Sequence, residues 1–148
     1  MPLKARVTED MKAAMRAKDG PRLAAIRLLL AAIKQREVDE RRELADPEVL
    51  VTIEKMIKQR RDSIAQFEAG GREDLARSEA FEVALLQTYL PAQLSAAEVE
   101  EAVAAALAET GAGGPQGMGR AMALLRARLA GRADMTQVAA IVKSKLAG

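Results

Sequence analysis

Hydrophobic residues recur along this chain every three or four positions, which is the spacing of a helix that buries one face. No segment of strand length alternates apolar and polar residues with a period of two. The apolar stripes consist of Leu3, Val7, Met11 and Ala14; Leu23, Ile26, Leu30 and Ile33; Val49, Ile53, Met56, Ile64 and Phe67; Val99, Val103 and Leu107; Met118, Met122, Leu125 and Leu129; and Val138, Ile141 and Val142. The pattern predicts an all-α protein.

Helix-breaking and helix-capping residues divide the stripes into seven predicted helices. Asp46-Pro47 indicates a helix start, with Asp46 as the N-cap and the proline in the first turn. Gly70-Gly71 ends a helix and turns the chain, and Leu90-Pro91 ends the next helix. We therefore expect a four-helix N-terminal domain over residues 1–92 and a three-helix-bundle C-terminal domain over residues 93–148.

Composition narrows the chemistry that this chain can perform. Cysteine and histidine are both absent, which excludes disulfides, thiolate metal sites and the commonest general base. No apolar run approaches the ~20 residues that span a bilayer, and the N-terminus lacks the apolar core of a signal peptide. We therefore expect a cytoplasmic protein that uses no metal and no cofactor and does not associate with a membrane. Separately from this composition, we expect a bacterial origin.

No group of residues has the pattern of a catalytic site. The serines Ser63, Ser78, Ser95 and Ser144 lack a lysine or serine partner in a recognisable nucleophile motif. The glycine-rich segment 111–117 lacks the lysine, and the serine or threonine after it, that a phosphate-binding loop requires. We therefore predict no catalytic residue.

Positive charge is concentrated in the last third of the chain, although the net charge of the whole protein is only +2. From Thr110 onward there is one acidic residue, Asp134, against six basic residues. A concentrated basic surface attracts the phosphates of nucleic acids. The alternative is that these are ordinary helix-end charges that complement helix dipoles and keep a small bundle soluble. The candidate nucleic-acid-binding residues are Arg120, Arg126, Arg128, Arg132, Lys143 and Lys145.

Some charged residues fall within the apolar stripes of the N-terminal helices. The Gly70-Gly71 turn makes the helices before and after it antiparallel neighbours. Arg60 lies about as far before this turn as Glu79 and Glu82 lie after it, so we expect an ion pair between the two helices. By the same reasoning Asp10 should face Arg27 across the preceding turn. We interpret these as structural pairs that fix how the helices align. The alternative is that they mark a ligand pocket.

Several motifs that follow one another in order carry a resemblance to a known family. They are Arg22…Ile26-Arg27…Ala32-Ile33-Lys34, Lys58-Gln59-Arg60-Arg61-Asp62-Ser63-Ile64…Phe67, Gly71-Arg72-Glu73-Asp74-Leu75, and Tyr89-Leu90-Pro91-Ala92-Gln93-Leu94-Ser95. With these motifs the chain resembles the YqeY family over essentially its whole length. The resemblance implies an all-α protein with four helices followed by three.

The C-terminal motifs Met118-Gly119-Arg120 and Gly131-Arg132-Ala133-Asp134 are similar to the tail of the B subunit of aspartyl/glutamyl-tRNA amidotransferase. In that enzyme the tail helps to hold transfer RNA, while a separate catalytic cradle, which has no counterpart here, performs the glutamine-dependent carbon–nitrogen ligation. The chain departs from the tail at two places. Met135-Thr136 stands where a glycine and a basic residue often follow the turn, and Ala127 stands where a proline often interrupts the helix.

The resemblance and the charge pattern together predict a non-catalytic protein associated with transfer RNA or another structured RNA, with an amidotransferase or a synthetase as a possible protein partner. The alternative is a protein–protein adaptor of a tRNA-dependent amidotransferase-like assembly. The residues that lie off the main stripes would then be either an interface or a second core, and the sequence leaves both open; they are Leu28, Leu29, Leu124 and Phe81.

Overall fold

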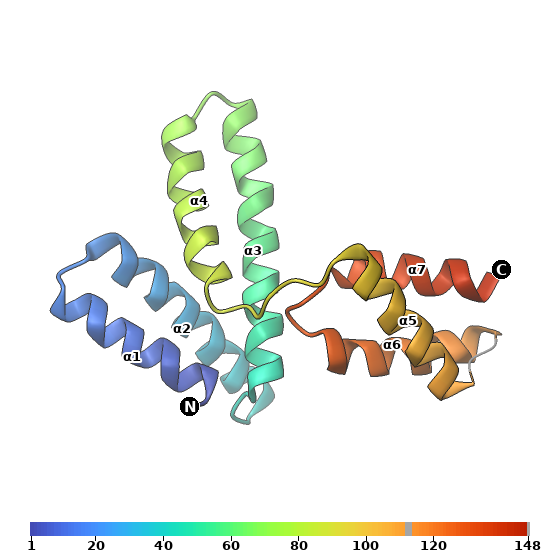
Figure 1. Ribbon diagram of the computed structural model, residues 1–148. Helices are drawn as coiled ribbons and strands as arrows, with labels where there is room; N and C mark the ends of the chain where they lie inside the picture. Colours follow the sequence, from blue (N-terminus) through green and yellow to red (C-terminus); the bar gives the residue numbers. More distant parts are fainter. Residues whose placement is uncertain (112–113, 148) are drawn as a thin grey trace. The chain divides into compact units, whose positions relative to one another are not determined.

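The computed structural model of the protein describes residues 1–111 and 114–147, apart from the side chains of residues 114 and 115. Residues 112 and 113 of the predicted glycine-rich segment therefore lie outside the described residues. Seven helices and no strand occur in the described ranges, which confirms the all-α prediction (Figure 1). The helices are α1 (Leu3–Arg16), α2 (Gly20–Glu40), α3 (Asp46–Ala69), α4 (Glu73–Gln87), α5 (Ala96–Thr110), α6 (Gly114–Leu129) and α7 (Met135–Ala147).

The chain divides into two compact units, Met1–Leu90 and Pro91–Gly148, each with its own hydrophobic core. In the first unit α1 packs on α2 and α3 packs on α4, and the two hairpins spread apart from the N-terminal half of α3 (Figure 1). Its largest fully buried side chains are Val7, Ile26, Leu29, Ile33, Val49, Ile53 and Leu86. In the second unit α5, α6 and α7 all contact one another around Val103, Leu125, Val138 and Val142.

Helix starts show where local sequence rules hold and where they fail. Ser95 forms the expected capping box: its hydroxyl accepts from the Glu98 amide at 3.1 Å, and its own amide donates to the Glu98 carboxylate at 3.0 Å. The prediction that Asp46 is the N-cap of α3 is wrong, because Ala45 occupies that position. The Asp46 carboxylate instead accepts from the amide of Leu3, at 2.9 Å, and so satisfies the first amide of α1.

The α3–α4 hairpin brings Arg60 and its two expected partners together. The Nε of Arg60 lies 2.7 Å from a carboxylate oxygen of Glu82 and 4.0 Å from one of Glu79. The Arg60 side chain is only 18% exposed, so its charge is partly shielded from water. A shielded guanidinium requires a charged partner, and Glu82 supplies one across the hairpin.

Asp10 and Arg27 do not pair, which corrects the sequence-based expectation. The Asp10 carboxylate accepts from the hydroxyl of Tyr89 at 2.6 Å, while Arg27 is exposed next to the buried Ile26. The Arg6 guanidinium lies over the Tyr89 ring, 4.9 Å from its centroid. Burial and the hydrogen bond to Asp10 raise the pKa of Tyr89. These contacts tie the end of α4 to α1.

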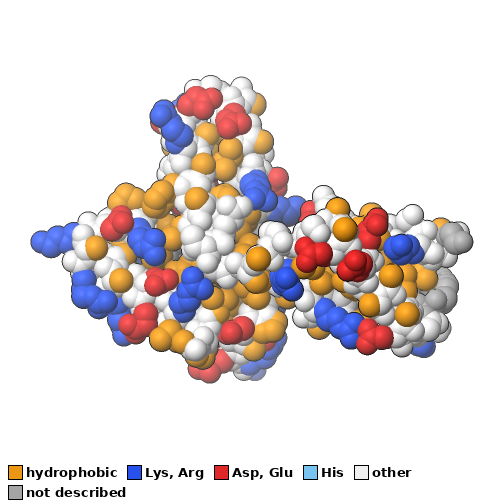
Figure 2. All heavy atoms as spheres, viewed as in Figure 1, with side chains coloured by type: hydrophobic (Ala, Val, Ile, Leu, Met, Phe, Trp, Pro, Cys, Tyr) orange, Lys and Arg blue, Asp and Glu red, His pale blue; other side chains and the backbone are white. Residues whose placement is uncertain are grey.

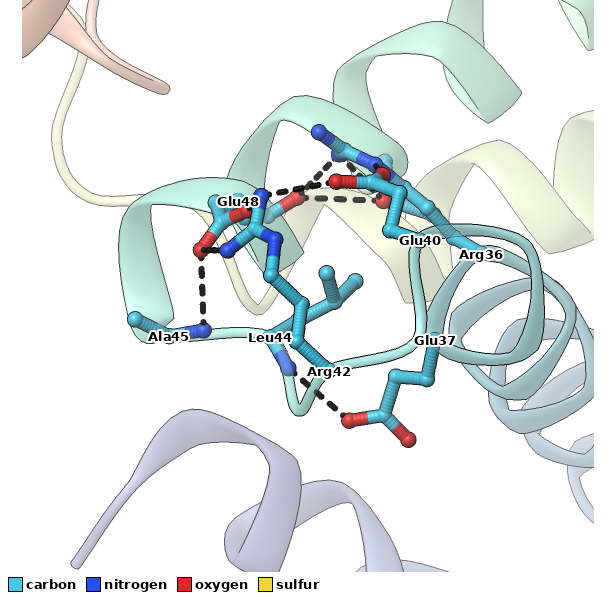
Figure 3. A network of polar contacts seen from close by, with 8 residues as sticks. Arg36, Glu37, Glu40, Arg42, Leu44, Ala45 and Glu48 are labelled. Atoms are coloured by element: carbon cyan, nitrogen blue, oxygen red, sulfur yellow. Dashed lines mark hydrogen bonds and ion pairs between the residues drawn. The ribbon is translucent and has the colours of Figure 1, made fainter.

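A polar network holds the loop between α2 and α3 (Figure 3). The buried carboxylate of Glu37 accepts from the Lys4 ammonium at 2.8 Å and from the Leu44 amide at 2.9 Å. Both hydrogen bonds lower the pKa of Glu37 from its ordinary 4.5, and the bond from Lys4 has the larger effect. Nearby, Arg42 contacts both Glu40 and Glu48, and the Glu48 carboxylate also accepts from the Ala45 amide. The network joins α1, α2 and the start of α3.

Replacing Arg60 with alanine should destabilise the protein by about 1–3 kcal/mol, between the values for exposed and buried ion pairs, because Glu82 would lose its shielded partner. Urea denaturation measures the loss. The matched control is Arg61→Ala, an exposed arginine at the next position of the same helix, which should change stability by less than about 0.5 kcal/mol. Equal effects of the two substitutions would show that Arg60 is a solvated surface residue.

Replacing Glu37 with glutamine should lower the urea midpoint near neutral pH, because the Lys4 ammonium loses its carboxylate partner. The folded-state pKa of Glu37 is lowered, so its stabilising contribution is present above pH 4.5 and is lost as the pH falls through the folded value. The difference between variant and wild type should therefore shrink as the pH is lowered from neutral to below 4.5. Glu43→Gln, which changes an exposed glutamate in the adjacent loop, is the control. A difference that does not depend on pH would contradict the assignment.

Candidate nucleic-acid interface

The six basic residues predicted to bind nucleic acid lie on α6, on the turn after it and on α7. Arg120, Arg126 and Arg128 belong to α6, Arg132 to the turn, and Lys143 and Lys145 to α7. All are exposed except Arg132, which is half-buried. Since residues two positions apart on a helix do not face one another, Arg126 and Arg128 point to different flanks of α6, as do Lys143 and Lys145 on α7.

Two of the six cations already have partners within the second unit. Arg128 forms two hydrogen bonds with the Glu109 carboxylate of α5, one of them 2.8 Å long, and these lower the pKa of Glu109. The Nε of Arg132 donates to the carbonyl of Ala92 at 3.2 Å. In the same turn the Arg132 carbonyl accepts from the Leu94 amide, and the Gly131 carbonyl accepts from the Gln93 side chain. Arg132 therefore fastens the start of the unit to the turn between α6 and α7.

The other four cations, Arg120, Arg126, Lys143 and Lys145, have no ion-pair or hydrogen-bond partner within the described ranges 1–111 and 114–147. Because Arg128 reaches toward α5, Arg126 lies on the opposite flank of α6, the one nearer α7. Lys145 lines a small groove with Glu100 of α5, so Lys143 lies on the flank of α7 nearer α6. Arg126 and Lys143 therefore border the same side of the α6–α7 pair.

The second unit is not basic throughout, because acidic residues accompany the basic ones. Residues 91–148 contain six basic residues and five acidic ones, Glu98, Glu100, Glu101, Glu109 and Asp134, four of which lie on α5. On the face that Figure 2 shows, red and blue side chains alternate over this unit and do not separate by sign. The sequence count from Thr110 onward omitted α5, whose acidic residues pack beside the basic helices.

Sequence reasoning missed a second basic region, in the first unit. Residues 11–36 contain seven basic residues and a single acidic one, Asp19, whose carboxylate accepts from the Arg22 amide at 3.2 Å as the N-cap of α2. This ratio is as one-sided as that of the C-terminal region and occupies a shorter stretch. A charge count over successive windows would have found it. The segment forms most of the α1–α2 hairpin.

An open depression of about 850 Å³ lies in the first unit between the start of α1 and the loop before α3. Its lining includes Lys4, Thr8, Glu9 and Glu43. The ammonium of Lys4 is held by Glu37, and the hydroxyl of Thr8 donates to the Lys4 carbonyl within α1. These side chains are therefore engaged in holding the fold, and the depression offers no activated nucleophile among the residues that line it.

None of the helices in the described ranges combines the length and the apolar character that crossing a membrane requires.

Three relatives illustrate what the chain is similar to, and each is named "Altered inheritance of mitochondria protein 41, mitochondrial". The protein of Eremothecium gossypii is 43% identical over 103 residues, which cover 69% of this chain and 56% of the relative. That of Kluyveromyces lactis is 43% identical over 86 residues, covering 57% and 46%. That of Saccharomyces cerevisiae strain YJM789 is 40% identical over 82 residues, covering 55% and 44%. The chain thus matches about half the length of these curated relatives.

The relatives contradict the expectation of a bacterial, cytoplasmic protein, because they come from yeasts and their names assign them to mitochondria. The expectation rested on the absence of an apolar leader, and that absence says nothing of a mitochondrial location.

The family itself is shown by a separate comparison. The family model described as "Yqey-like protein" matches residues 4–146, nearly the whole chain. The protein therefore belongs to the YqeY family.

Proposed function

We propose that this protein is a non-catalytic binding protein for structured RNA, such as transfer RNA, and that its second unit contacts RNA phosphates. The observation that carries the proposal is that Arg120, Arg126, Lys143 and Lys145 are exposed and have no partner among the described residues. Each such cation can replace a counterion at a phosphate and so contribute to affinity. We also propose that the chain has the two domains expected from the sequence, with four helices over residues 1–92 and three over residues 93–148.

The composition of the second unit favours contacts to phosphates over contacts to bases. Residues 91–148 contain no aromatic residue, so the unit has no side chain on which unstacked bases could stack. Arg126 and Lys143, at the border between α6 and α7, are the pair of cations placed best to reach one phosphate strand together. Recognition of this kind follows the shape of the RNA backbone and reads little sequence.

The similarity to the amidotransferase tail supports transfer RNA as the ligand class, because that tail holds transfer RNA in the larger enzyme. An amidotransferase or a synthetase would then be a fitting protein partner, which supplies the chemistry that this chain does not carry. A second candidate role, as an adaptor in such an assembly, is favoured by two apolar side chains of the first unit. Leu28 and Phe81 are 46% and 45% exposed, far more than a core side chain.

The proposal predicts that unfractionated transfer RNA binds with a strong salt dependence. The four phosphate contacts of the second unit contribute about −3 to the log–log slope of affinity against salt, which fluorescence anisotropy measured at several salt concentrations can determine. Arg126→Gln should make the slope less steep by about 1 and weaken binding.

The control is the double substitution Arg128→Gln with Glu109→Gln, which removes a neighbouring arginine of the same helix together with its partner and leaves the net charge unchanged. Its slope should equal that of the wild type. Absence of binding near physiological salt would refute the proposed function. Equal slopes for Arg126→Gln and the control would refute the assignment of Arg126.

A further inference from the structure

We propose that the α1–α2 hairpin carries a second RNA-phosphate surface, on the face turned away from α3 and α4. We call it the outer face of the hairpin and define it by Arg27 and Lys34, with Lys18 at its end. The inference rests on the proposed binding of structured RNA, but it concerns a different unit of the protein and different residues.

Most of the hairpin's cations form no hydrogen bond or ion pair, although Lys34 is close enough to Glu37 to help lower the pKa of that carboxyl. Of the seven basic residues in 11–36, Lys12 pairs with Glu9 at 3.4 Å and Arg36 pairs with Glu40 at 2.5 Å. The side chains of the other five have no hydrogen-bond or ion-pair partner in the part of the chain that the structure describes. Four of these are fully exposed and the fifth, Arg22, is half-buried; the exposed ones are Arg16, Lys18, Arg27 and Lys34.

Arg27 and Lys34 share one side of α2. They are seven residues apart, which is two turns, so they lie above one another at a spacing of about 10 Å. Arg36 bonds Thr52 of α3 and therefore marks the side of α2 that faces α3. Lys34 precedes Arg36 by two positions, which places it on nearly the opposite side of the helix. Both cations thus lie on the side of α2 away from α3.

The turn at the end of the hairpin also carries positive charge, on Lys18. Lys18 adopts a left-handed backbone conformation, with φ of 56°, at the position after the α1 C-cap where glycine is usually found. The turn thus carries an exposed ammonium group where a glycine would fit the backbone better. Arg16 lies two residues earlier, in the last turn of α1, so positive charge continues from the outer face around the end of the hairpin.

We choose RNA over an anionic membrane as the partner. A helix that lies on a membrane inserts a continuous apolar face beside its cations. The exposed large apolar side chains of α1 and α2 are Met15, Leu28 and Val38, and each lies ten or more residues from the next along the chain, so they form no continuous apolar face beside Arg27 and Lys34. A row of cations on two rigid packed helices fits a phosphate backbone instead.

The test compares two double variants of the full chain. Arg27→Gln with Lys34→Gln removes two cations of the outer face, whereas Lys55→Gln with Lys58→Gln removes two exposed lysines of α3 and changes the net charge equally. Binding of unfractionated transfer RNA is measured at several salt concentrations. The hairpin variant should bind roughly tenfold or more weakly near 0.1 M salt, with a slope less steep by about 2, and the α3 variant should bind like the wild type.

A third variant, Lys18→Gly, separates binding from folding. Glycine relieves the left-handed backbone, so the thermal midpoint should rise while the affinity for transfer RNA falls. A lower midpoint, or unchanged affinity, would overturn the role of Lys18.

The remaining outcomes are distinct. Equal weakening by the hairpin and α3 variants would overturn the inference in favour of a general charge effect. Weakening by Arg126→Gln alone, with the hairpin variant unchanged, would overturn it and leave the proposed function standing. If the wild type fails to bind transfer RNA, the proposed function and the inference both fail. Binding to phosphatidylcholine–phosphatidylserine vesicles that Arg27→Gln with Lys34→Gln abolishes would then assign the outer face to membranes.

Discussion

The buried carboxylate of Glu37, on α2, holds together α1 and the loop before α3, which lie far apart along the chain. It accepts from the ammonium of Lys4 on α1 and from the amide of Leu44 in the loop before α3. A carboxylate withdrawn from water is tolerated only when such donors surround it, so the three segments must meet at this point. The Asp46 carboxylate, which accepts from the Leu3 amide, fixes the start of α1 to the start of α3 in the same way.

This use of acidic side chains explains the charge pattern of the surface. The carboxylates of Asp10, Asp19 and Glu37 are engaged by a tyrosine hydroxyl, a backbone amide and a lysine. Of these three, Glu37 is matched by the cation Lys4, and Asp19 is the single acidic residue among the seven basic ones of residues 11–36. Positive surface charge in a protein of net charge +2 can therefore arise from where the acids are placed, without an excess of basic residues over the whole chain.

The sequence was sufficient wherever the partners are neighbours along the chain or are related by one turn. The helical stripes, the Ser95 capping box and the meeting of Arg60 with Glu82 all follow from local periodicity and from distance to a turn. The partners of Asp10 and Asp46 could not be predicted, because Tyr89 and Leu3 lie 79 and 43 residues away and meet them only through tertiary packing. The pairing of Arg128 was missed for a related reason. A count of charges along the sequence does not register that Glu109, from another helix, pairs with Arg128.

Each unit holds its own end of the chain at the junction between Leu90 and Pro91. Tyr89 is anchored to Asp10 in the first unit, and the Ala92 carbonyl is anchored to Arg132 in the second. Only Leu90 and Pro91 separate these anchors, and the proline ring fixes one of the few remaining backbone torsions. Each unit therefore secures its own end of the chain, through Asp10 in the first and through Arg132 in the second, and the loss of either bond would release chain in that unit alone.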